Sequence, residues 1–197
     1  MNEDFELLIS TFLTTGVGIS DHFLSKILSI QLNSEILRLS TSKLLKPAGI
    51  GHLEGLQLNG TIRGDEIYWL DHSHENKIES TFLELMESFV IYLNMSCYTG
   101  ITGFEFHYSF YKTGSFYKKH LDQFHDNSSR KYSIISYLNA DWVDGDGGEL
   151  IIQLKPENQI ISPIQGKTVF FKSNELVHEV LLTHQNRLSV TGWLKVG

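Results

Sequence analysis

The second half of the chain consists of short segments in which apolar and polar residues alternate, and this pattern limits the fold more than any other feature. Turn signals separate the segments, notably DGDGG at 144–148 and PIQG at 163–166. Alternation with a period of two places successive side chains on opposite faces of a strand. Many short strands joined by turns are typical of a sandwich or barrel. The segments are 103–111, 131–139, 148–154, 167–173, 178–184 and 187–196.

The first hundred residues show apolar side chains at helical spacing instead. We predict helices over 3–14, 20–43 and 78–95, with Ser20 or Asp21 as the N-cap of the second. Residues 47–60 hold one proline and four glycines, which predicts a loop, and strand-like residues follow at Glu66–Leu70. We therefore expect a mainly β fold whose helices pack on the outside of the sheets.

Length and composition favour one globular domain and exclude several classes of partner. The 197 residues suggest a single domain, and the formal net charge of −7 argues against binding to a nucleic-acid backbone. No run approaches the ~20 apolar residues of a membrane span. The acidic start lacks the basic region of a signal peptide, and Cys97 alone permits no internal disulfide. We expect a cytoplasmic protein without nucleic-acid or membrane partners.

Two ligand types stand two positions apart at His120 and Asp122. On a strand such residues share a face, and an imidazole and a carboxylate suit a first-row divalent metal. One more histidine would complete a facial triad with open coordination positions. Among nine histidines, His178 is the best candidate. Alone, however, the two-residue pattern is more often a pair of surface residues than a metal site.

A hairpin would bring His178 beside an arginine. We predict a four-residue loop at 183–186, so that Leu182 faces Arg187 and His178 lies opposite Thr191. On the second strand Arg187 shares a face with Ser189, Thr191 and Trp193, which is typical of a polar pocket. A guanidinium beside an open metal site suits a dicarboxylate ligand.

The order and spacing resemble those of iron(II)- and 2-oxoglutarate-dependent dioxygenases, with the second histidine 58 residues after the first and the arginine nine further on. Within them the chain is similar to the prolyl 4-hydroxylase family, which includes the hypoxia-inducible-factor prolyl hydroxylases and their bacterial homologues. The resemblance covers about residues 45–195. Five blocks carry it: TIRGDEIYWL (61–70), FHYSFYKTGSFYKKHLD (106–122), YSIISYLNADW (132–142), GGELII (147–152) and HEVLLTHQNRLSVTGW (178–193).

The resemblance implies a double-stranded β-helix, a cupin-like jelly roll, supported by α-helices. It implies one dioxygenase domain over 1–197, with helical support over 1–100, a substrate loop at about 47–62, and the jelly-roll core with the metal site over 101–197. The implied cofactors are Fe(II), the cosubstrate 2-oxoglutarate and O2, with ascorbate as a candidate reductant.

The resemblance also assigns roles to individual residues. His120, Asp122 and His178 would hold the iron, and Arg187 would pair with the distal carboxylate of 2-oxoglutarate. The remaining cosubstrate contacts would come from Tyr137, Tyr111, Ile135, Leu150, Val180, Thr191 and Trp193, with Tyr137 donating a hydrogen bond and Tyr111 lying near the iron. Arg63 and Asp65 would help fix the substrate loop or the substrate.

Three functions remain open at this point. The first is 4-hydroxylation of a prolyl residue in a protein or peptide, with a translation-machinery protein as one target. The second is hydroxylation of a free amino acid or another small molecule. The third is a metal-binding jelly roll that is not an oxygenase, which would have no need of Arg187.

Overall fold

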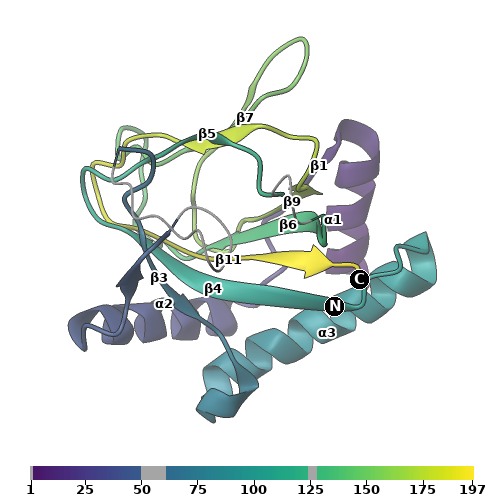
Figure 1. The fold of residues 1–197 in the computed structure, drawn as a ribbon, viewed down its shortest axis with the longest axis horizontal. Coiled ribbons are helices and arrows are strands. Elements are labelled where there is room, and N and C mark those ends of the chain that lie inside the picture. Colours follow the sequence, from purple (N-terminus) through teal and green to yellow (C-terminus); the bar gives the residue numbers. More distant parts are fainter. Residues whose placement is uncertain (1, 50–60, 124–127) are drawn as a thin grey trace.

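The computed structural model describes residues 2–49, 61–123 and 128–197, which form two facing antiparallel sheets and a layer of helices (Figure 1). The larger sheet has the order β1-β9-β6-β11-β4-β3-β2, and the smaller one has the order β5-β10-β7-β8. The larger sheet contains β1 (Val17–Ser20), β2 (Lys46–Pro47), β3 (Glu66–Trp69), β4 (Gly103–Tyr111), β6 (Arg130–Tyr137), β9 (Thr168–Lys172) and β11 (Arg187–Lys195). The smaller sheet contains β5 (Tyr117–His120), β7 (Leu150–Ile152), β8 (Gln159–Ile161) and β10 (His178–Val180).

The helices cover one face of the larger sheet, while the smaller sheet faces its other side (Figure 1). They are α1 (Asn2–Thr15), α2 (Lys26–Thr41) and α3 (Lys77–Cys97), with a short 3-10 turn, η2 (His72–His74), before the last. On β4, Phe106, Tyr108 and Phe110 join the core beneath the helices, whereas the alternate residues His107 and Tyr111 line a cavity on the opposite face. The predicted mainly β fold with supporting helices is confirmed.

The second helix begins later than predicted. Ser25 is its N-cap and accepts a hydrogen bond from the backbone N–H of Leu28, at 3.2 Å. Ser20, one of the two predicted caps, instead ends β1 and pairs with Thr168 of β9. The prediction of Ser20 or Asp21 was wrong because strand pairing with a distant segment outweighs a local capping preference.

The predicted hairpin between His178 and Arg187 was also wrong. Strand β10 pairs with β5 and β7, whereas β11 pairs with β4 and β6, so the two strands lie in different sheets. A crossing between facing sheets needs as few residues as a hairpin, so loop length cannot distinguish the two. Residues 50–60, most of the predicted substrate loop at 47–62, lie outside the described residues. In the part of the chain that is described, no helix is long and apolar enough to cross a membrane.

Gly192, in the middle of β11, allows the strand to pack closely against β4. A Cβ atom at this position would lie 2.2 Å from the carbonyl oxygen of Glu105 and 2.2 Å from Cδ1 of Phe106. We therefore expect Gly192→Ala to lower the free energy of unfolding by about 3 kcal/mol, measured by urea denaturation. Gly103→Ala, at the start of β4 with no atom within 4 Å, is the control. Equal stability of the two variants would contradict the close-packing argument.

Candidate metal centre and cosubstrate cavity

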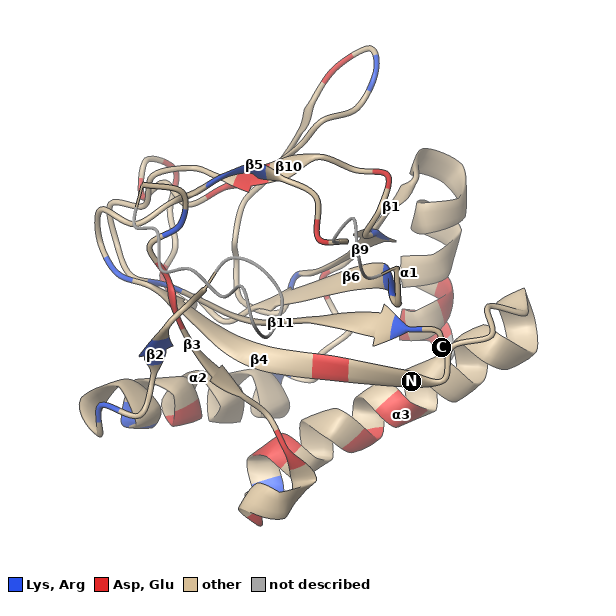
Figure 2. Ribbon diagram, in the orientation of Figure 1, with Lys and Arg blue, Asp and Glu red and all other residues tan. Residues whose placement is uncertain are grey.

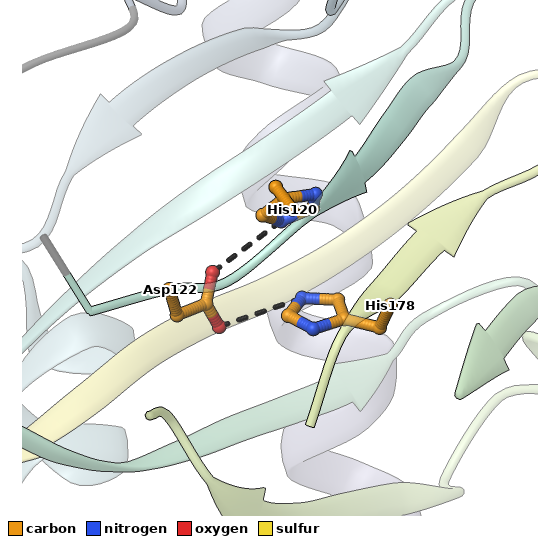
Figure 3. Close-up of side chains that lie close together, drawn as sticks. All are labelled: His120, Asp122 and His178. Carbon is orange, nitrogen blue, oxygen red and sulfur yellow. Dashed lines mark ion pairs between the residues drawn. The ribbon is translucent and has the colours of Figure 1, made fainter. Parts of the chain in front are cut away.

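Two neighbouring strands of the smaller sheet bring three ligand side chains together. His120 ends β5, His178 begins β10, and the two are register partners. Asp122 follows two residues after His120, and its two carboxylate oxygens lie 3.4 Å from Nε2 of His120 and 3.6 Å from Nε2 of His178 (Figure 3). The three ligand atoms all lie within 4.8 Å of one another.

Backbone carbonyl groups fix the orientation of both imidazoles. Nδ1 of His120 donates to the carbonyl of Lys118 at 2.7 Å, and Nδ1 of His178 donates to that of Leu176 at 3.0 Å. A carbonyl can only accept, so each Nδ1 carries a proton, and in the neutral form of each ring Nε2 keeps its lone pair. Both lone pairs are therefore available to a metal ion between the rings and Asp122.

The Asp122 carboxylate stays ionised although it is only 8% exposed. Burial by itself raises the pKa of the carboxyl, but the positive charge of the two imidazoles in their protonated form and the hydroxyl of Ser133 hold the pKa well below its usual range. The Ser133 hydroxyl donates to Oδ2 at 2.7 Å and also contacts the hydroxyl of Ser173. Two neutral imidazoles and one carboxylate, gathered on one side, fit a divalent ion such as Fe(II) and leave its other positions open.

A cavity of about 590 Å³ opens between the two sheets beside this centre. His120, Asp122 and His178 form one part of its lining, and Arg187 forms another. Five further residues with predicted cosubstrate roles line it, and they are Tyr111, Ile135, Leu150, Val180 and Thr191. Trp193 lines the cavity too and has the guanidinium of Arg130 at 3.4 Å above its ring.

Arg187 is a buried cation that has no acidic partner in the described part of the chain. It is 2% exposed, and its Nε donates to the carbonyl of Gly148 at 2.8 Å. No carboxylate of the described residues forms an ion pair with it. A buried guanidinium without an ionic partner costs folding free energy. Its position therefore indicates that it pairs with an anionic ligand. Gly148 has φ +75°, and a Cβ there would lie 2.9 Å from Cδ of Arg187.

Two tyrosines surround this guanidinium. Its Cζ lies 4.9 Å from the ring of Tyr111 and 5.0 Å from that of Tyr137. Burial raises the pKa of both hydroxyls, so both stay protonated and can donate. The hydroxyl of Tyr137 is buried and has no hydrogen-bond partner in the described chain, although Tyr137 itself is not part of the cavity lining. The arrangement offers donors and positive charge to a carboxylate at this end.

Arg63 and Asp65 pair with each other. The guanidinium donates to both carboxylate oxygens of Asp65, at 2.7 and 2.6 Å, and it also lies 4.4 Å from the ring of Tyr117. Arg63 forms a bridge with Tyr117 on the strand of His120, and the carbonyl of Asp65 accepts from the backbone N–H of Ala48 at 2.9 Å. Their predicted part in fixing the loop or the substrate stays a prediction.

Several residues that shape the site were not predicted from the sequence. Ser133, which holds Asp122, could have been found from β6, because it shares a face with Ile135 and Tyr137. Gly148 could have been suspected from the paired glycines before β7, but its contact with Arg187 depends on the tertiary fold. The stacking of Tyr117 on His120 is likewise a product of the strand arrangement.

Comparison with known proteins gives consistent results. The model of the 2OG-Fe(II) oxygenase superfamily matches residues 106–195, a range that includes the three ligands and Arg187. A Pseudomonas putida prolyl-4-hydroxylase is 32% identical, with a TM-score of 0.88 over 98% of this chain and 99% of that one.

Two more distant structures share the fold. A Trichoplax adhaerens prolyl hydroxylase, solved with a peptide of the hypoxia inducible factor oxygen degradation domain, has a TM-score of 0.85 at 24% identity, covering 97% of this chain and 88% of that one. The collagen prolyl hydroxylase of Paramecium Bursaria Chlorella virus-1, solved as a 2OG complex, has a TM-score of 0.63 at 18% identity, covering 93% and 97%.

Removing the carboxylate should abolish metal binding. We expect Asp122→Ala to weaken Mn(II) binding by at least about a hundredfold, because it removes the anionic ligand between the two imidazoles. Electron paramagnetic resonance of free Mn(II) during a titration measures this affinity. His184→Ala, which removes an exposed histidine outside the cluster, is the control and should bind as the parent does. Tight binding by Asp122→Ala would place the metal elsewhere.

The position of Arg187 should depend on Gly148. We expect Gly148→Ala to weaken 2-oxoglutarate binding by about tenfold, because the added methyl group meets Cδ of Arg187 and the φ of +75° is strained for alanine. Calorimetry with the Mn(II)-loaded protein measures this. Gly145→Ala also has a positive φ but no atom within 4 Å, so it controls for backbone strain. Equal losses in both variants would contradict the role of Gly148.

Proposed function

The chain belongs to the prolyl 4-hydroxylases of the 2OG-Fe(II) oxygenase superfamily, and on that premise we propose that it hydroxylates a prolyl residue at the 4-position in a protein substrate. It is a dioxygenase that uses Fe(II), 2-oxoglutarate and O2. The observation that carries the proposal is that the ligand triad and the unpaired Arg187 open into one cavity. The products of each turnover would be succinate, carbon dioxide and the hydroxylated residue.

The side chains that line or border this cavity would have three different roles. His120, Asp122 and His178 would hold the iron, which supplies, when bound, the activation of dioxygen that side chains cannot perform. Arg187 and the hydroxyl of Tyr137 would bind the distal carboxylate of 2-oxoglutarate and set its direction. Ile135, Leu150 and Val180 are apolar lining residues that would exclude water from the cosubstrate.

An aromatic wall, formed by Trp69, His107 and Trp193, borders the same sheet face beyond the cosubstrate residues. Its ring centroids are 4.9 Å apart for Trp69 and His107 and 5.4 Å apart for His107 and Trp193. Burial lowers the pKa of His107 to about 3, so this imidazole is neutral. Nε1 of Trp193 and Nδ1 of His107 are buried and have no partner among the described residues. Aromatic faces beside the unpaired indole N–H of Trp193 suit a prolyl ring flanked by peptide carbonyls.

Charges around the cavity favour a peptide over a free amino acid. Among the described lining residues the single carboxylate is Asp122, which faces the metal centre. Nearby Glu105 pairs with Arg130 and Lys195, so it is not available to a ligand. The ammonium group of a free amino acid would lack an acidic partner among the described lining residues. Lysines also lie on β2 and β5, while acidic residues gather on α3 (Figure 2).

A peptide substrate is consistent with what related structures hold. The Trichoplax prolyl hydroxylase, which has the same fold, was solved with a bound peptide fragment. We propose further that the target is a protein of the translation machinery, which accords with the expected cytoplasmic location. Treating ribosomal and translation-factor fractions with the enzyme, then seeking the mass of one added oxygen on a prolyl residue, tests this target. An unmodified fraction under turnover conditions would argue for another protein.

A peptide-bound proline, which lacks the charged amino and carboxyl groups of the free amino acid, should be a better substrate than free L-proline. We expect a capped, proline-containing peptide to have a kcat/KM at least about tenfold above that of free L-proline, because its termini carry no ammonium that needs an acidic partner. Succinate formation measures both reactions. The same peptide with alanine in place of proline is the control and should give no hydroxylated product. Equal turnover of free proline would favour the alternative function, hydroxylation of a small molecule.

A further inference from the structure

The segment before β3 supports the strand that carries the first metal ligand. The backbone N–H of Lys118 donates to the carbonyl of Ile62 at 2.9 Å, and that of Gly64 donates to Phe116 at 3.0 Å. Within its own sheet β5 is an edge strand that pairs with β10. Residues 62–64 therefore pair along the edge of β5 that β10 leaves free.

Side chains extend this support to the imidazole itself. The ring of Tyr117 stacks on that of His120, with centroids 3.5 Å apart and planes inclined by 14°. The guanidinium of Arg63 lies 4.4 Å from the centroid of the Tyr117 ring. Asp65, which is 2% exposed, holds that guanidinium by two hydrogen bonds. We call Asp65, Arg63 and Tyr117 the brace.

The brace and the backbone together restrict how His120 can turn. The hydrogen bond from Nδ1 to the Lys118 carbonyl fixes one edge of the imidazole, and the Tyr117 ring covers one of its faces. Rotation about the side-chain bonds would break one contact or the other. The guanidinium of Arg63 contacts Asp65 and the Tyr117 ring, and it also lies 3.4 Å from the carbonyl oxygen of Gly49.

We propose that Asp65, Arg63 and Tyr117 are positioning residues that hold His120 in its metal-binding orientation through the stacked ring. The proposal rests on the proposed function only in taking His120 as an iron ligand. It does not depend on the identity of the substrate. The ring of Tyr117 is the operative contact, because it is the part of the brace that stacks on His120.

Mn(II) affinity measured by electron paramagnetic resonance tests the ring. Tyr117→Phe keeps the stacked ring and should bind Mn(II) within about twofold of the parent, whereas Tyr117→Leu should bind about tenfold more weakly. Thermal unfolding of the metal-free proteins accompanies each titration, because a purely structural role would lower the melting temperature and leave the affinity of the folded protein unchanged. Equal affinities of the Phe and Leu variants, strong or weak, would overturn the proposal.

A second pair of variants tests the ion pair. Asp65→Asn removes the charge that holds Arg63 and should weaken Mn(II) binding by about threefold to tenfold. Glu66→Gln breaks the neighbouring exposed pair with Lys112 and should leave the affinity unchanged. Equal Mn(II) affinities of Asp65→Asn and Glu66→Gln would also overturn the proposal. Failure of the parent to bind Mn(II) would overturn the metal site and the brace together, whereas a failed brace in a tightly binding parent leaves the proposed function standing.

Discussion

The metal centre depends on one buried negative charge. Asp122 sits between two imidazoles in the interior of a β structure, where an unpaired carboxylate would be protonated. It stays ionised because Ser133 donates to it and because positive charge faces it, carried by the imidazoles when they are protonated or by a metal ion held between the neutral rings. Both rings face Asp122 because His120 and His178 are register partners on β5 and β10. The pairing of β5 with β10, the orientation of the two imidazoles and the charge of Asp122 therefore depend on one another. The cavity opens beside the centre that they form.

Local patterns predicted the strands and the chemically distinctive residues well. The alternation at 103–111 became β4 with the predicted bounds. His120 and Asp122 reach one centre, but they do not share a strand face as predicted, because β5 ends at His120 and Asp122 lies in the bend that follows. Helices and strands whose formation depends mainly on their own residues can be predicted, because the apolar pattern of the sequence has the same period as the element. The fold class followed from the number of such strands.

Features that depend on contacts between residues far apart in the sequence could not be predicted from local patterns. The chain between His178 and Arg187 looks like a hairpin loop, yet the two strands belong to different sheets. Val17–Ser20 looks like the approach to a helix and pairs with β9 instead. The stack of Tyr117 on His120 and the closeness of Gly148 to Arg187 likewise need the assembled sheets. The sequence gives the order and spacing of these residues, but the pairing of strands and the packing of the two sheets determine which residues they contact.

Anchoring Arg187 to a backbone carbonyl has a consequence for the choice of organic acid. Because Gly148 holds the guanidinium from one side and two tyrosine rings lie close to it, the positive end of the cavity cannot retreat to admit a longer chain. The metal ligands fix the other end through strand register. The fold therefore sets the separation between the two ends, and a dicarboxylate that reaches both of them would need the matching number of carbons between its carboxylates.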